Sequence, residues 1–234
     1  MTRVNGHGQP IGEAVPGWSA RPFPQRVVLS GRYVRLEPVT VDHAAGLHQA
    51  LAGPDDDPLW TYRPGERPAD LAGMAALVAT AEAATDAVTF AIVPSGEDPQ
   101  GLASLMRVDP AQGSVEAGSI IFSRALQRTR AATEALALLA GYVFDELGFR
   151  RFEWKCDSLN EPSRAAAHRL GFVYEGRFRQ ALVYKGRNRD TDWFSITDGE
   201  WPTVKAAYDA WLDPANFDAD GDQRRRLSVL TARR

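Results

Sequence analysis

The sequence predicts an α/β (α+β) fold in which a mixed, mostly antiparallel central sheet of about six to seven strands is flanked by helices. Three observations predict it. Several short segments alternate apolar and polar residues, as half-buried strands do. Turn-forming residues separate the segments in the middle of the chain, which is typical of antiparallel strands. A long Ala- and Leu-rich stretch then connects two strand segments, and such a helical connection normally makes a right-handed parallel crossover.

The 234 residues fit one full domain with extensions at both ends. Residues 1–25 are crowded with Gly and Pro and lack the apolar segment of a signal peptide, so we interpret them as an extended, partly disordered leader. Trp18 and Phe23 are the side chains expected to fasten it to the domain. Residues 26–198 form the predicted domain, and residues 199–234 form a C-terminal helix and a charged tail.

The first half of the domain is predicted to contain a strand, two helices and three further strands. The stretch "RYVRLEPV" alternates apolar and charged residues and stops at Pro38, as a first strand should. In "TVDHAAGLHQAL", Thr40 or Asp42 can cap a helix, and a second Ala-rich helix covers about residues 69–84. The segments "VTFAIV" and "QGLASLMRV" follow as a hairpin, and "GSVEAGSIIF" adds another strand.

The second half centres on a helix over residues 127–147, whose wide apolar surface indicates packing against a sheet. The stretch "FRRFEWKCD" then alternates like a half-buried strand, with Cys156 on the core side. In "NEPSRAAAHRLGF", Asn160 fits the N-cap of a helix, Pro162 its first turn and Gly171 its end. Two further strands around "VYEGRFRQALVY" and "DTDWFSIT" and a terminal helix, "WPTVKAAYDAWL", complete the order.

The start of the central helix carries basic residues where acidic ones are favoured. Gln127, Arg128 and Arg130 stand just before the helical repeat "AATEALALLAGYVF", although the unpaired N–H groups at a helix start are partly positive. This arrangement costs stability unless an anion sits among these groups, so it indicates a phosphate site. If only the charge at the helix start is considered, a solvated basic surface explains these residues equally well.

A resemblance to a known family is carried by two stretches, "LQRTRAATEAL" and "ELGFRRFEWKCDSLNEPSRAAAHRLGFVYEG". They are similar to the GCN5-related N-acetyltransferase (GNAT) family, in its RimJ/RimL-like branch, and the resemblance covers roughly residues 31–197. It implies a GNAT fold and transfer of an acetyl group from acetyl-CoA, as co-substrate, to an amine. The family signature, Gln/Arg-x-x-Gly-x-Gly/Ala, falls on residues 127–132. The cofactor-binding residues that the resemblance implies are Phe122, Gln127, Arg128, Arg130, Ala131, Ala132, Thr133 and Asn160.

Arg130 departs from the family signature, which has glycine at this place. Glycine lets the backbone approach the pyrophosphate closely, so its loss is expected to affect the geometry of the loop. The helix N-terminus can still hold phosphate through its free N–H groups. Arg128 and Arg130 can add charge-assisted contacts to it.

The resemblance also implies two catalytic residues, Glu116 and Ser163. The amine must lose a proton to become a nucleophile, and Glu116 matches a Glu that related enzymes often have near the cofactor and the amine. A solvated strand carboxylate explains Glu116 equally well. Ser163 matches a serine near the thiolate that must be reprotonated, and Asn160 a residue lining the cofactor channel. For Ser163, a role in helix capping explains the residue as well as a catalytic role does. For Asn160, helix capping is the stronger interpretation.

Two arginines in "EGRFRQALVYKGRNRD" are predicted to bind the acceptor. Arg177 and Arg179 share one strand face, so the hairpin would draw an acceptor that bears a carboxylate or phosphate beside its amine. A solvated hairpin in which Arg177 or Arg189 pairs with Glu175 or Asp190 is the stronger alternative, because surface charges commonly have no further role.

Composition narrows the class of function. The net charge of −3 argues against a general nucleic-acid-binding role, and no apolar run is long enough to cross a membrane. The single cysteine fits a reducing cytoplasm and excludes a cysteine-based zinc site. We therefore expect a cytoplasmic acetyltransferase without a metal, acting on a small-molecule or peptide amine, with a homodimer left open. The alternatives are a non-catalytic acyl-CoA-binding module and a transferase for a larger acyl group, such as succinyl.

Overall fold

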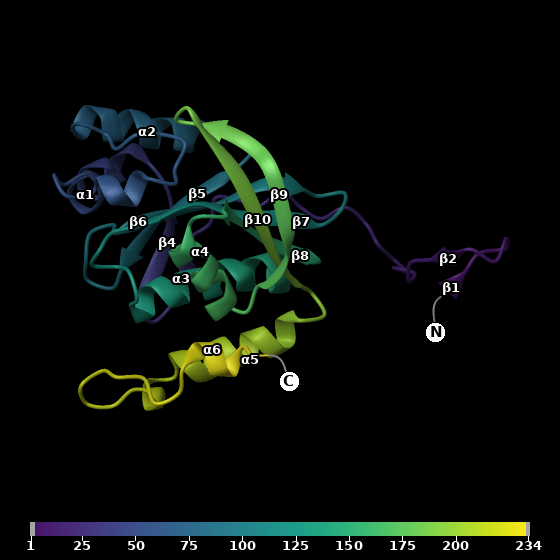
Figure 1. The fold of residues 1–234 in the computed structure, drawn as a ribbon. Helices are drawn as coiled ribbons and strands as arrows, with labels where there is room; N and C mark the ends of the chain where they lie inside the picture. The colour runs from purple at the N-terminus through teal and green to yellow at the C-terminus, as the bar shows by residue number, and fades with distance from the viewer. Residues whose placement is uncertain (1–2, 233–234) are drawn as a thin grey trace.

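The computed structural model describes residues 3–232, and these residues form a central eight-stranded sheet (Figure 1). In spatial order the strands are β3 (Leu29–Ser30), β4 (Val34–Pro38), β5 (Val88–Pro94), β6 (Gly101–Asp109), β7 (Ser114–Phe122), β8 (Arg151–Asp157), β10 (Arg187–Thr197) and β9 (Val173–Tyr184). Neighbouring strands pair antiparallel except β7 and β8, which confirms the predicted mixed sheet. One strand more than expected is present because β3, only two residues long, extends the edge.

The parallel strands β7 and β8 pair over only part of their length. Residues 114–117 of β7 lie against residues 151–154 of β8, after which β7 continues to Phe122 without β8 as a neighbour. Ser119, just beyond the paired part, has a left-handed φ of 50°, and the register of β6 and β7 shifts nearby. We call this place the strand divergence. It leaves backbone N–H and C=O groups on one edge of β7 without a sheet partner.

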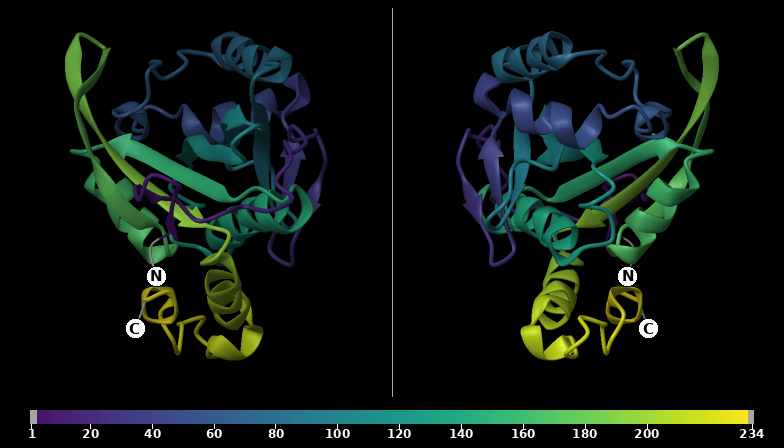
Figure 2. Two further views of the ribbon diagram at one scale, coloured as in Figure 1. Left: turned by 90° about the vertical axis from the view of Figure 1, so that its right-hand side faces the viewer. Right: turned by 90° about the vertical axis from the view of Figure 1, so that its left-hand side faces the viewer.

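Helices cover both faces of the sheet (Figure 2). They are α3 (Arg130–Gly141), α4 (Glu161–Arg169) and α5 (Trp201–Leu212) on one face, and α1 (Ala44–Leu51) and α2 (Leu71–Ala83) on the other. Successive strand residues point to opposite faces, so Phe90 joins the core under α3 whereas Ala91 packs under α2. Below, the two sides are called the α3 face and the α2 face.

The central helix α3 begins at Arg130, three residues later than predicted. Arg128 has a left-handed φ of 64°, which cannot continue a right-handed helix. Thr129 is the cap, and its hydroxyl accepts a hydrogen bond of 3.1 Å from the N–H of Ala132. At the other end the helix widens into a π-helical turn, where the N–H of Leu147 donates to the carbonyl oxygen of Tyr142.

The two ends of the chain differ: the C-terminal helices bury Trp201, Tyr208 and Leu227 in the core, whereas the N-terminal segment extends from the domain. Near the N-terminus, β1 (Arg3–Val4) and β2 (Pro10–Ile11) form a small ribbon that projects away from it (Figure 1). Trp18 donates a hydrogen bond of 2.9 Å to the carbonyl oxygen of Ala111, and Phe23 packs against the core, so these two side chains do fasten the leader. Near the C-terminus, α5 is followed by α6 (Leu227–Leu230). Within residues 3–232, every helix is too short or too polar to span a lipid bilayer.

Candidate active site

The start of α3 opens onto a cavity of about 510 Å³. One wall is the turn before the helix, with Arg128, Thr129 and Ala131, and the opposite wall belongs to the chain after α5, including Phe217. The first N–H groups of a helix have no partner within it, and Thr129 satisfies that of Ala132 with its hydroxyl and that of Thr133 with its carbonyl oxygen. Arg128 is exposed beside these groups. The cavity therefore combines positive charge with hydrogen-bond donors, which is the chemistry that a phosphate requires.

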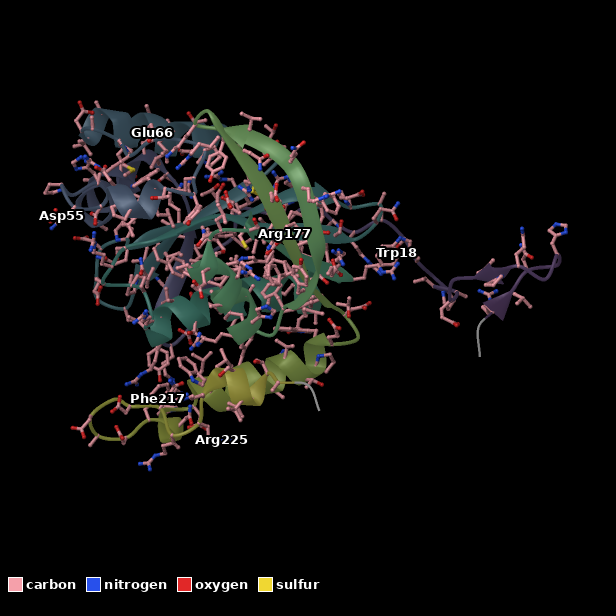
Figure 3. All side chains as sticks on the ribbon, in the orientation of Figure 1. Trp18, Asp55, Glu66, Arg177, Phe217 and Arg225 are labelled. Carbon is pink, nitrogen blue, oxygen red and sulfur yellow. The ribbon has the colours of Figure 1, made fainter. Side chains whose placement is uncertain are left out.

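Arg130 is the first residue of α3, and its side chain lies against aromatic rings. Its guanidinium carbon is 4.1 Å from the ring centre of Phe217 and 5.5 Å from that of Tyr33. In Figure 3, the labelled Phe217 lies beyond the start of α3, on the chain that follows α5. The positive φ of this turn falls on Arg128 and not on Arg130. A larger residue in place of the signature glycine therefore needs no strained backbone here, and the cavity in front of the helix stays open.

Of the remaining residues predicted around the phosphate turn, three are buried and Gln127 is exposed. Ala131, Ala132 and Thr133 are buried, and the Thr133 hydroxyl accepts a hydrogen bond of 3.1 Å from Arg169. Gln127 donates its amide N–H to the carbonyl oxygen of Phe122 at 3.1 Å, which ties the turn to the end of β7. Any contact from the alanines to an anion would therefore come from their backbone.

On the α3 face, Asn160 and Ser163 lie at the start of α4. The Asn160 side-chain oxygen accepts the N–H of Ser163 at 3.1 Å, so the predicted N-cap is confirmed, whereas its cofactor contact stays a prediction. The Ser163 hydroxyl accepts a hydrogen bond of 3.0 Å from the indole of Trp154. Its own proton can be donated, and the Cys156 thiol is one acceptor within reach. Burial raises the pKa of the neighbouring Cys156 thiol to about 11, with a hydrogen bond from Ser163 acting in the opposite direction.

Glu116 is 3% exposed and is surrounded by cations. Both of its carboxylate oxygens lie 2.8 Å from Arg107, and one lies 3.0 Å from the Lys155 ammonium. Lys155 also pairs with Glu153 at 2.7 Å and sits 3.8 Å from the ring centre of Trp193. Among residues 3–232, no three His, Cys, Asp or Glu side chains gather as metal ligands would. Glu116 is thus neither a solvated surface carboxylate nor part of a cluster of acids.

Glu116 and Ser163 approach the strand divergence from opposite faces. Val115 and Ala117, on either side of Glu116, pack in the core of the α3 face, so Glu116 points to the α2 face. Ser163 belongs to α4 on the α3 face. A group that passes through the divergence from the α3 face would meet, beyond the sheet, whatever lies beside Glu116.

The β9–β10 hairpin reaches over the α2 face. Arg177 of β9 donates to the fully buried Asp192 at 2.7 and 3.1 Å, whereas Arg179 is exposed. Lys185 at the tip bonds the carbonyl oxygen of Trp60 at 2.8 Å and the carboxylate of Glu66 at 3.0 Å. Arg177 therefore pairs with Asp192 and not with Glu175 or Asp190, and acceptor binding by Arg177 and Arg179 stays a prediction. Figure 3 labels Arg177 on the hairpin and Glu66 near α2.

Sequence reasoning missed the partners of the predicted residues. Arg107 and Lys155 come from β6 and β8, which flank β7, and their distances to Glu116 depend on strand register. A signal existed for Lys155, because it alternates with Trp154 and Cys156 and so belongs to the α2 face. No comparable local signal places Phe217 against Arg130 across the chain.

Comparisons with known proteins identify the family and the fold. A family model described as an acetyltransferase (GNAT) domain matches residues 34–173. Among solved structures, a GCN5-related N-acetyltransferase from Brucella melitensis is 45% identical, with a TM-score of 0.90 over 93% of this chain and 99% of that chain. RimL, a ribosomal L7/L12 alpha-N-protein acetyltransferase solved with coenzyme A, shares the fold at 19% identity, with a TM-score of 0.64 over 74% of this chain and 99% of that chain.

A curated relative is YdaF of Bacillus subtilis (strain 168), whose name describes a candidate ribosomal N-acetyltransferase. It is 32% identical over 105 residues, which are 45% of this chain and 57% of that protein. The chain thus spans just over half the length of this relative.

Proposed function

Because the chain belongs to the GCN5-related N-acetyltransferase (GNAT) family, in its RimJ/RimL-like branch, we propose that it transfers an acetyl group from acetyl-CoA to a primary amine. The amine belongs to a small molecule or to a protein N-terminus. The observation that carries the proposal is the cavity at the start of α3, where Arg128 and helix N–H groups meet. Acetyl-CoA supplies the thioester that the amine attacks directly in a ternary complex, forming the C–N bond as the C–S bond breaks.

The residues around the cavity would bind acetyl-CoA from its phosphates to the thioester end of its pantetheine arm. Arg128, Arg130 and the backbone N–H group of Ala131 would face the phosphates, whereas the N–H of Ala132 already bonds the Thr129 hydroxyl. The unpaired edge of β7, up to Phe122, offers backbone groups to the amides of the pantetheine arm. The arm then passes through the strand divergence beside Asn160 and Ser163.

Glu116 and Ser163 would move the two protons of the reaction. Glu116 accepts the proton that the amine loses, directly or through one water. Arg107 and Lys155 hold its carboxylate in place on the acceptor side. Ser163 is placed on the cofactor side with a proton to donate, so it can protonate the departing thiolate. An N–H of the β7 edge near the divergence would stabilise the charge that develops on the carbonyl oxygen.

A single experiment separates this function from its alternatives. Thiol release is measured with acetyl-CoA and succinyl-CoA against a panel of amino acids, polyamines and peptides with free N-termini. The name of the Bacillus subtilis relative makes peptides the first acceptors to test. Release with acetyl-CoA and an amine supports the proposal. Binding of CoA without release from any acceptor would instead identify a non-catalytic module, and faster release from succinyl-CoA a transferase for larger acyl groups.

A further inference from the structure

A second cavity, of about 230 Å³, lies on the α2 face between α2 and the strands β5, β6 and β7. Its α2 wall is apolar and includes Leu77 and Ala81. The strand wall carries hydroxyl groups, because Thr89 and Ser104 hydrogen-bond each other at 2.8 Å within it. In Figure 1, α2 lies above β5 and β6, on the side toward which the hairpin tip extends. The cavity is therefore on the acceptor side of the sheet.

Arg63 lines this cavity and lacks a negative partner. It comes from the loop before α2, stacks 5.3 Å above the ring centre of Trp60 and donates one hydrogen bond of 2.7 Å to the carbonyl oxygen of Ser119. No Asp or Glu among residues 3–232 forms an ion pair with it. Burial lowers the pKa of the Arg63 guanidinium to about 10. Arg63 is partly buried, and a partly buried cation without a counter-ion favours an anion brought by a ligand.

The cavity adjoins Glu116 at Gly118. Met106 lines the cavity and lies so close over Gly118 that an added Cβ would stand 2.3 Å from the Met106 sulfur. The same Cβ would stand 3.0 Å from a carboxylate oxygen of Glu116. Ser119, which accepts from Arg63, is the next residue along β7. An acceptor that places its amine beside Glu116 would therefore extend toward Arg63.

We propose that Arg63 binds a carboxylate of the acceptor, so that the preferred substrates are amines bearing a carboxylate close to the reacting nitrogen. The inference rests on the proposed acetyltransferase function and names its substrate class. A planar carboxylate matches the remaining N–H groups of a guanidinium fork. Thr89 and Ser104 hydrogen-bond each other, which leaves one hydroxyl proton of the pair to donate to the carboxylate. Arg177 is less suited to this role because Asp192 already holds it. Free amino acids and peptides with an acidic residue at the N-terminus are the chemical classes that fit.

The test compares acceptors in matched pairs of a carboxylate and its carboxamide, with kcat/KM expressed per concentration of unprotonated amine, because the two members also differ in the pKa of the amine. One pair is an amino acid and its carboxamide, and the other is a peptide beginning with Asp and the same peptide beginning with Asn. The wild-type protein is expected to show a kcat/KM roughly 10- to 100-fold higher for the carboxylate member, the scale of one charged hydrogen-bonded contact. Equal values for both members in both pairs overturn the inference and leave the acetyltransferase function intact.

Two substitutions assign the preference to Arg63. Arg63→Gln should raise KM for the carboxylate acceptor and leave the rate with the carboxamide nearly unchanged, whereas Arg63→Lys should keep part of the preference. Arg35→Gln on β4 makes the same charge change on an exposed pair with Glu37 and should keep the preference. Retention of the full preference in Arg63→Gln overturns the assignment. CoA affinity is measured in each variant, so that loss of folding or of the cofactor site is distinguished from loss of acceptor binding. Absence of turnover with every acceptor would contradict the proposed function itself.

Discussion

Replacement of Glu116 by Gln tests the acceptor side of the mechanism. The substitution keeps the shape of the side chain and removes a negative charge that is 3% exposed and contacts Arg107 and Lys155. Loss of a general base lowers a rate by about 10²–10⁴-fold, so kcat should fall on this scale at neutral pH. CoA affinity should stay nearly unchanged, because the phosphate turn lies on the opposite side of the sheet.

The stability cost of the same substitution can be bounded from its contacts. Removing one partner of a buried ion pair costs about 3–5 kcal/mol. Here Arg107 is half-exposed and can reach water, and Lys155 retains Glu153 and Trp193. We therefore expect a loss of about 1–3 kcal/mol in the free energy of unfolding, measured by urea denaturation.

Glu153→Gln is the matched control for this experiment. Glu153 lies opposite Glu116 in the β7–β8 register and shares Lys155 with it, at 2.7 Å, but it also pairs with Arg151. Its replacement should cost comparable stability with only a small change in kcat. The assay is thiol release across a pH series with one fixed amine. Unchanged turnover of Glu116→Gln at every pH would refute the assignment and leave solvent to deprotonate the amine.

Three further changes probe other parts of the account. Arg128→Glu should weaken CoA binding by at least about 1–3 kcal/mol in calorimetry, and unchanged affinity would remove Arg128 from the phosphate site. Ser163→Ala should lower kcat by about 10²–10⁴-fold with little effect on CoA affinity, whereas an equal kcat would reduce Ser163 to a structural role. The hydrogen bond from Arg151 lowers the pKa of the Glu175 carboxyl, so its stabilisation is present above the unfolded-state pKa and is lost as pH falls through the folded-state value. Glu175→Gln should therefore lose less stability than the wild type in urea denaturation between about pH 5 and pH 3, and parallel losses would contradict this linkage.

Elements with local signals could be predicted from the sequence. Asn160 caps α4, and the alternation in "FRRFEWKCD" correctly assigned Trp154 and Cys156 to the core. The start of α3 was placed too early because Arg128 adopts a left-handed φ that non-glycine residues rarely take. The surrounding structure, and no local residue preference, determines that conformation.

Features that depend on long-range packing could not be predicted. The cationic surroundings of Glu116 require the register of three strands, and the contact of Phe217 with Arg130 requires the path of the chain after α5. The stretch "LWTYRPGERP" contains no pattern that indicates a binding role for Arg63, since that role depends on where the loop before α2 meets β7. Composition and periodicity describe single elements, whereas these contacts join elements far apart in sequence.

The central claim is that the start of α3 binds the phosphates of acetyl-CoA, and it is tested most directly by isothermal titration calorimetry. CoA is compared with pantetheine, which has the same thiol-bearing arm without phosphates. If Arg128, Arg130 and the helix N–H groups bind the pyrophosphate, CoA should bind roughly 100-fold or more tightly than pantetheine, with the advantage decreasing as salt rises. Equal affinity for the two compounds would contradict the account.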